Sequence, residues 1–351
     1  MPSTTFGQVQ LADVRTPALC VDIKAVDANI DVMARARPGA SLRPHVKAFK
    51  STALAGRIQD RGGHQSFCCA TLREVEGMVA AGLDHDLLLA NQTLDAEHLA
   101  AVVDSTDRII TVAVDSVTTI ELAADAARRS GDLAVLVDVN VGMPRCGCRP
   151  EEAGALAASA HEAGLVVRGV MGYEGHVVGN PDRDWRRAQL ATSMEGLRRA
   201  HADVGGDVIS AGGTGTYDLH DWATEVQAGS YVLMDSHYQD LGLPFRRALW
   251  VEATVLSVNP DGYAVANAGL KALAMDHGNP SIDEFEVVFC SDEHTTFAYT
   301  DIPPSVGDRV RIWPAHVDPT VALHDRFVVI DDATASDPRV VDEWAVNLRG
   351  W

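Results

Sequence analysis

This chain of 351 residues has few basic residues, no long apolar runs and no cysteine pattern typical of disulfides. No apolar stretch approaches the ~20 residues that a membrane helix needs. Residues 1–8 lack the basic start and apolar run of a signal peptide. Lys and Arg number 29 against 49 Asp and Glu, which gives a net charge of −20. Such a surface repels nucleic acid and anionic membranes, so we expect neither as a partner.

The six cysteines form no disulfide or zinc-ribbon pattern. Cys146 and Cys148 could suggest a metal site, but no second Cys or His pair lies near them in the sequence. We therefore expect a protein of the reducing cytoplasm. Apolar residues make up 46% of the chain and charged residues 22%, which is typical of a globular protein with a real core.

Short apolar runs followed by alanine-rich amphipathic segments recur through the first two thirds of the chain. This alternation predicts parallel β/α architecture. Eight runs favour a closed (β/α)8 TIM-like barrel, although the count alone leaves an open sheet possible. The runs are residues 19–23, 42–46, 67–70, 87–90, 109–114, 133–139, 166–171 and 208–211.

The pattern changes near residues 243–244, after which β-rich runs alternate with Pro, Gly and Asp turns. We therefore predict two domains. Residues 18–244 would form the barrel, and residues 245–351, with residues 1–17, would form a mainly β domain.

Lys47 stands at the end of the second run, in the sequence Arg-Pro-His-Val-Lys. In parallel barrels the active site lies at the carboxyl ends of the strands. A lysine there can be desolvated, which lowers its pKa toward the nucleophilic range. The alternative is a surface lysine at a strand–helix turn.

A glycine-rich segment, residues 212–217 (GGTGTY), follows the last run, and residues 227–231 (QAGSY) come soon after it. Glycines allow close approach of the backbone, and Thr hydroxyls with N–H groups can cradle a phosphate. The late loops of such barrels are the usual phosphate site. A plain tight turn is the competing interpretation for either segment taken alone.

His316 and Asp318 lie one residue apart in the β-rich region. If this segment is extended, both side chains project from the same face. An imidazole and a carboxylate together suit a divalent ion such as Zn²⁺, Mn²⁺ or Mg²⁺. A polar surface turn is the alternative.

These segments, in this order, resemble the D-threonine aldolase and D-serine dehydratase family of fold-type III, alanine-racemase-like pyridoxal-phosphate enzymes. The matching motifs are residues 16–19 (TPAL), 43–47 (RPHVK), 69–74 (CATLRE), 141–147 (VGMPRCG), 172–176 (GYEGH), 212–217 (GGTGTY), 227–231 (QAGSY), 268–273 (AGLKAL), 292–294 (DEH) and 314–320 (PAHVDPT). The resemblance is closest to D-threonine aldolase. It implies an alanine-racemase-type barrel followed by a mainly β domain, and a homodimer.

The resemblance also implies that Lys47 bonds covalently to pyridoxal 5'-phosphate. His176 is the candidate base, with a hydrogen-bonded structural histidine as the alternative. The remaining cofactor contacts that the family implies are Arg145, Tyr173, Gly213, Thr214, Gln227, Gly229 and Ser230. Gln227 falls where alanine racemases place an arginine opposite the pyridine nitrogen.

In this family a His with either Asp or Cys holds the metal, and aldolases tend to carry His-x-Asp. The pair His316 and Asp318 thus implies Mn²⁺ or Mg²⁺, with Zn²⁺ as the softer option. The expected activity is that of a lyase, namely retro-aldol cleavage of a small D-3-hydroxy-α-amino acid, of the D-threonine type, to glycine and an aldehyde.

Two departures from the family pattern make the substrate side chain less certain than the reaction. Ala48 and Phe49 follow Lys47 where Thr and His are usual, and Thr295 follows His294 where Gly is common. Two alternatives stay open: a dehydratase acting on D-serine or D-threo-3-hydroxyaspartate, and a non-catalytic pyridoxal-phosphate carrier.

Overall fold

The computed structural model describes residues 9–131 and 133–350, and these divide into two compact units. The barrel unit holds residues 33–47 and 55–229, and the β-rich unit holds residues 9–32, 48–54 and 230–349. The expectation of no signal peptide falls on residues 1–8, outside the described residues.

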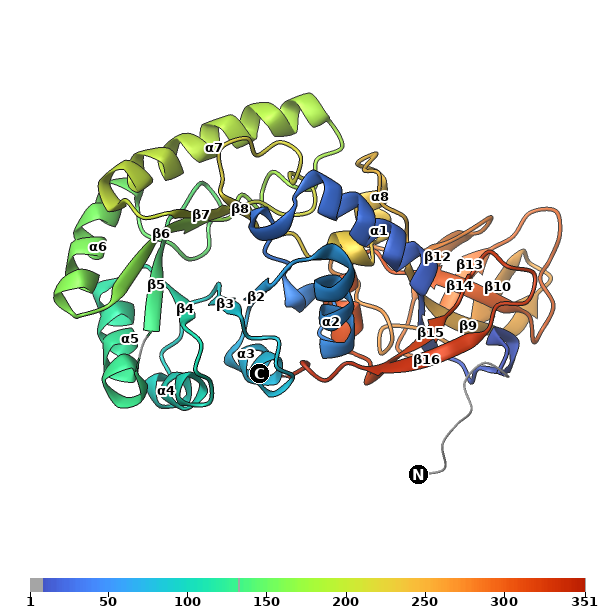
Figure 1. Ribbon diagram of the computed structural model, residues 1–351. Coiled ribbons are helices and arrows are strands. Elements are labelled where there is room, and N and C mark those ends of the chain that lie inside the picture. The colour runs from blue at the N-terminus through green and yellow to red at the C-terminus, as the bar shows by residue number, and fades with distance from the viewer. Residues whose placement is uncertain (1–8, 132, 351) are drawn as a thin grey trace. The chain divides into compact units, whose positions relative to one another are not determined.

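A seven-stranded parallel sheet forms the centre of the barrel unit (Figure 1). Four of its strands are buried at every residue, as is typical of a parallel sheet that is covered on both faces. In chain order the strands are β2 (Ser66–Cys69), β3 (Asp86–Leu89), β4 (Ile110–Val114), β5 (Leu133–Asp138), β6 (Val166–Gly172), β7 (Val208–Ala211) and β8 (Glu225–Val226).

The helices that connect these strands lie along the outer side of the curved sheet (Figure 1). Three of these helices begin at a side-chain cap in the loop that follows a strand. Thr71, Asp95 and Ser116 each accept a hydrogen bond from the backbone N–H three residues on. The helices of the chain are α1 (Ile23–Ala36), α2 (Thr52–Gly62), α3 (Leu72–Ala80), α4 (Ala96–Asp104), α5 (Val117–Ser130), α6 (Ala153–Glu162), α7 (Arg183–Val204), α8 (Ser236–Gln239) and α9 (Val317–Ala322).

Residues 42–45 join the two edges of this sheet through isolated parallel bridges. Leu42 pairs with Val226 of β8, and His45 pairs with Cys68 of β2. Pro44 has no N–H to donate, so it contributes only its carbonyl, which accepts from Cys68 N. The chain thus makes an eighth barrel segment without forming a regular strand there.

The predicted barrel fold is confirmed, but two of its eight predicted strands are wrong: residues 42–46 contribute only isolated bridges, and residues 19–23 lie in the other sheet. The run at residues 19–23 forms β1 (Ala18–Asp22), which pairs with two strands of the other sheet, β15 and β9. The missing barrel strand is β8, whose two residues produce no apolar run. A buried five-residue strand has the same pattern in either sheet, so the sequence does not reveal its partners.

The β-rich unit contains a nine-stranded sheet built around β9 (Leu249–Asn259), which pairs with β1, β10 and β14. The predicted mainly β character after residue 244 is confirmed. The unit also takes in residues 9–32 and 48–54, so its bounds differ from the predicted domain bounds. The other strands are β10 (Tyr263–Ala266), β11 (Ser281–Ile282), β12 (Glu286–Cys290), β13 (Thr295–Ala298), β14 (Arg309–Trp313), β15 (Arg326–Ile330) and β16 (Val340–Ala345).

Candidate active site

Lys47 lies in a short 3-10 turn, Val46–Ala48, just beyond the bridging segment 42–45. Its Nζ is 5.8 Å from the centroid of the Tyr173 ring, and the guanidinium carbon of Arg145 is 5.4 Å from the same centroid. Tyr173 directly follows β6. The structure thus brings together three residues that were predicted to surround the cofactor.

The loop after β7 approaches its neighbours as closely as only glycine allows. A Cβ on Gly215 would lie 1.9 Å from the carbonyl oxygen of Val178, and one on Gly213 would lie 3.3 Å from the Tyr173 ring. Gly212 has a φ of +83°, and a Cβ there would lie 2.9 Å from the ring of His220. Thr214 lies in this loop and is buried. A backbone packed this closely is compatible with the predicted phosphate site.

Glu174 ties this loop together through hydrogen bonds. Its carboxylate is fully buried and accepts hydrogen bonds from Thr216 Oγ1 at 2.6 Å, His220 Nε2 at 2.9 Å and Gly212 N at 3.2 Å. Burial would raise the pKa of Glu174, but the charge of His220 and these hydrogen bonds outweigh it and lower the pKa. The sequence motif contained Glu174, but its role was not predicted.

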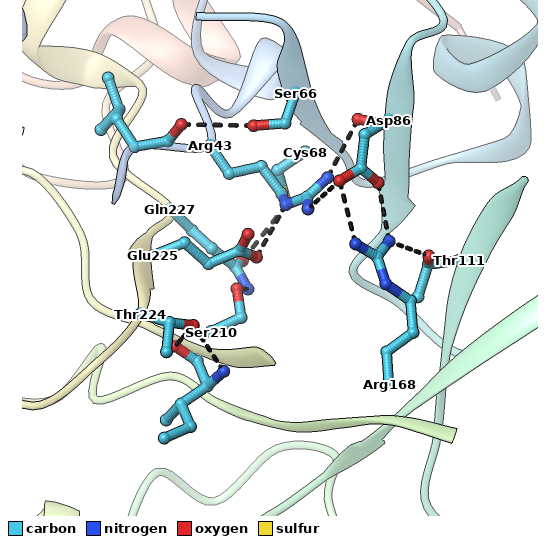
Figure 2. A network of polar contacts seen from close by, with 12 residues as sticks. Arg43, Ser66, Cys68, Asp86, Thr111, Arg168, Ser210, Thr224, Glu225 and Gln227 are labelled. Atoms are coloured by element: carbon cyan, nitrogen blue, oxygen red, sulfur yellow. Dashed lines mark hydrogen bonds and ion pairs between the residues drawn. The ribbon is translucent and has the colours of Figure 1, made fainter. Parts of the chain in front are cut away.

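Gln227 is held inside the barrel rather than at a free surface. Its Nε2 donates to Ser210 Oγ at 2.8 Å, and its Oε1 accepts from Cys68 Sγ at 3.3 Å. Burial raises the pKa of the Cys68 thiol, which keeps it protonated as a donor. Figure 2 shows this amide beside Cys68 and Ser210. Its predicted place opposite the pyridine nitrogen stays a prediction.

Arg43, in the same motif as Lys47, belongs to a buried ionic network instead (Figure 2). It donates to Glu225 at 2.7 Å and to the carboxylate of Asp86 at 2.8 Å, and Arg168 donates to Asp86 at 2.7 Å. Asp86 and Glu225 begin their strands, so the network lies at the opposite strand ends from the glycine loop. Burial favours neutral Asp86, but the hydrogen bonds from Arg168 and Arg43 prevail and lower its pKa.

His176, the predicted base, is exposed. Its Nε2 lies 3.3 Å from Ser193 Oγ of α7, and its ring lies close to Gly142, where a Cβ would meet it at 3.1 Å. A catalytic role for His176 stays a prediction.

His316 and Asp318 come together, but not through the extended segment that the sequence suggested. His316 is extended and precedes α9, while Asp318 lies in the first turn of that helix. His316 Nε2 is 3.8 Å from Asp318 Oδ2. Ser230, predicted as a phosphate ligand, has its hydroxyl 3.4 Å from Asp318 Oδ1. Gly229, its predicted partner in that role, directly precedes it in the chain.

Further ionisable groups surround this pair. Asp276 Oδ2 is 2.6 Å from His316 Nδ1, and the His277 ring stacks on that of His316 at 4.0 Å. Asp235 accepts a hydrogen bond from Val317 N at 3.1 Å, and burial raises the pKa of its carboxyl to about 7. Imidazole and carboxylate donors at this spacing fit a divalent ion. None of Asp235, Asp276 and His277 was predicted.

A curved seven-stranded parallel sheet with a separate, mostly β domain is the arrangement of the alanine-racemase-like fold. The family described as alanine racemase, N-terminal domain, matches residues 21–237, and the putative serine dehydratase domain matches residues 248–330. The chain belongs to the D-threonine aldolase and D-serine dehydratase family of alanine-racemase-like pyridoxal-phosphate enzymes, and it is an aldolase-like lyase.

Two curated relatives and one solved structure resemble the chain over nearly its whole length. The D-threonine aldolase of Arthrobacter sp is 33% identical, covering 97% of this chain and 94% of its own. The 3-hydroxy-D-aspartate aldolase of Paracoccus denitrificans (strain Pd 1222) is 30% identical, covering 97% and 93%. The D-threonine aldolase structure from Filomicrobium marinum is 31% identical, covers 99% of both chains and has a TM-score of 0.92.

Pyridoxal phosphate is the cofactor that this family implies, and the chain is supported as an aldolase of D-3-hydroxy amino acids. Among the described residues, no helix is long and apolar enough to cross a membrane.

Proposed function

We propose that the chain catalyses retro-aldol cleavage of D-threonine and related D-3-hydroxy-α-amino acids to glycine and an aldehyde, with pyridoxal phosphate and Mn²⁺ or Mg²⁺. The observation that carries this proposal is the His316 and Asp318 pair, whose donor atoms are 3.8 Å apart. A carboxylate in this pair favours a hard ion, whereas a cysteine would favour Zn²⁺.

Each residue near Lys47 has a separate proposed role in binding the cofactor. Lys47 would carry it covalently, and the loop with Gly213 and Thr214 would bind its phosphate. Tyr173 would pack beside its ring, and Arg145 would add positive charge there, since its guanidinium lies 5.4 Å from Tyr173. When bound, pyridoxal phosphate takes up the electron pair released at Cα when a bond to that carbon breaks.

His316 and Asp318 would hold the divalent ion, which as a Lewis acid makes a substrate hydroxyl more acidic. His176 is the proposed acceptor of the hydroxyl proton. Asp318 and Ser230 share a hydrogen bond, so the Ser230 hydroxyl would orient the carboxylate in addition to its proposed role at the phosphate.

A glycine-release assay tests this proposal over a panel of D-3-hydroxy amino acids, with and without Mn²⁺. We expect glycine from the D but not the L isomers, and loss of turnover in chelator. Asp318→Ala should abolish turnover and keep the absorbance of the bound cofactor, because Asp318 is not proposed to hold the cofactor. Turnover that survives in chelator would contradict the metal assignment.

A dehydratase acting on D-serine or D-threo-3-hydroxyaspartate is the second candidate, favoured by the match of residues 248–330 to the putative serine dehydratase domain. The products from D-threonine separate the two reactions: an aldolase gives glycine and acetaldehyde, and a dehydratase gives ammonia and 2-oxobutyrate. Asp318→Cys tests the metal assignment, because a thiolate selects softer ions. We expect this variant to prefer Zn²⁺ over Mn²⁺.

We also propose a homodimer in the cytoplasm, and light scattering of the purified protein checks the oligomeric state.

A further inference from the structure

The imidazole of His316 has a carboxylate at each of its two nitrogens. Nδ1 is 2.6 Å from Asp276 Oδ2, which is a hydrogen-bond distance. Nε2 is 3.8 Å from Asp318 Oδ2, which is too long for a hydrogen bond. The two ring nitrogens therefore differ: Nδ1 is within hydrogen-bond distance of a carboxylate, and Nε2 is not.

The loop that carries Asp276 is tied to the backbone of His316. Thr320 Oγ1 donates to the His316 carbonyl at 2.8 Å and accepts from Ala274 N at 3.1 Å. The adjacent His277 stacks on the His316 ring with an angle of 3° between the ring planes. One face of the ring and its Nδ1 edge are thus fixed by the same loop.

We infer that Asp276 is a positioning residue for the divalent ion, an inference that rests on the metal site in the proposed function. By accepting the Nδ1–H of His316, Asp276 fixes the tautomer in which Nε2 keeps its lone pair for the ion. It also fixes the rotation of the ring, so that Nε2 faces Asp318. Carboxylates in this arrangement make a metal-bound histidine more basic.

Asp276 could instead be a direct ligand, because donor atoms of Asp276, His277 and His316 lie within 4.8 Å of one another. The short distance argues against this. Two ligands with bonds of ~2.1 Å at a right angle to one ion lie ~3.0 Å apart. At 2.6 Å, Asp276 Oδ2 and His316 Nδ1 share a proton rather than an ion.

Binding of Mn²⁺ alone, measured without substrate through the electron paramagnetic resonance signal of the free ion, tests this role in the holoenzyme. We expect Asp276→Ala to raise the Kd about 10- to 100-fold. Asp276→Glu should recover part of the loss, since it keeps a carboxylate. Asp240 is an exposed acid that lines a pocket with His277, so Asp240→Ala is the charge-matched control and should change Kd by less than about twofold.

His316→Ala provides the reference for a lost ligand. If Asp276→Ala binds Mn²⁺ as well as Asp240→Ala does, Asp276 has no positioning role. If it loses binding as completely as His316→Ala, Asp276 is itself a ligand, and the inference is again wrong. Unchanged binding in His316→Ala would instead overturn the metal site of the proposed function. Thermal melts of every variant confirm that each is folded.

Discussion

Replacing Arg43 by Met should destabilise the barrel unit more than any other single change in its ionic network. Arg43 is 2% exposed and donates to both Glu225 and Asp86. Removing one partner of a buried ion pair costs about 3–5 kcal/mol, because the remaining charge is left in a poorly polarisable interior. Glu225 is 5% exposed, so water does not replace the lost guanidinium there.

Two further variants separate lost charge pairing from lost packing. In Arg43→Met with Glu225→Met, both buried charges are gone, and such replacements are often neutral. We expect this double variant to be at least about 2 kcal/mol more stable than Arg43→Met alone. Arg168→Met should cost only about 1–2 kcal/mol, because Arg168 and Asp86 are partly exposed.

Urea unfolding followed by far-ultraviolet circular dichroism measures these differences. We expect the wild type, Arg168→Met and the double variant all to be more stable than Arg43→Met. A double variant no more stable than Arg43→Met would refute the reasoning, because the loss would then come from packing rather than from an unpaired buried carboxylate.

Three other predictions follow from the barrel unit. Lys47→Ala should fold normally but retain no pyridoxal phosphate through borohydride reduction, as mass spectrometry of the protein would show. Glu174→Gln should weaken cofactor binding about tenfold, since an amide cannot accept from Thr216, His220 and Gly212 as a carboxylate does; fluorescence titration of the apoenzyme checks this. Because the pKa of Asp86 is lowered in the folded state, its stabilisation is present above the unfolded pKa of about 3.9 and is lost as pH falls below it. Asp86→Asn should therefore flatten the decline of the urea midpoint between about pH 5 and pH 3.

Most of the barrel could be predicted because its strands are buried on both faces and its helices are amphipathic. The runs at residues 133–139 and 208–211 match β5 and β7. The partners of β1 could not be predicted, since strand pairing depends on the rest of the chain. Nor could the turn of helix after His316, because proline three residues on suits a first helical turn and a loop equally.

The supporting residues of the site were harder to predict than Lys47 or His316. Arg43 and Glu225 are 182 residues apart in sequence, Glu174 and Thr216 are 42 apart, and His316 and Asp276 are 40 apart. No local pattern links such partners. These partners can be identified only in the folded structure, where each buried charged group lies next to its partner.

The products formed from D-threonine by the holoenzyme with Mn²⁺ test the central claim most directly. Carbon-13 spectra of uniformly labelled substrate follow the Cα–Cβ bond itself. Retro-aldol cleavage predicts labelled glycine and acetaldehyde in equal amounts, with loss of the coupling between Cα and Cβ. Ammonia and 2-oxobutyrate, in which all four carbons stay joined, would contradict the account and identify the chain as a dehydratase.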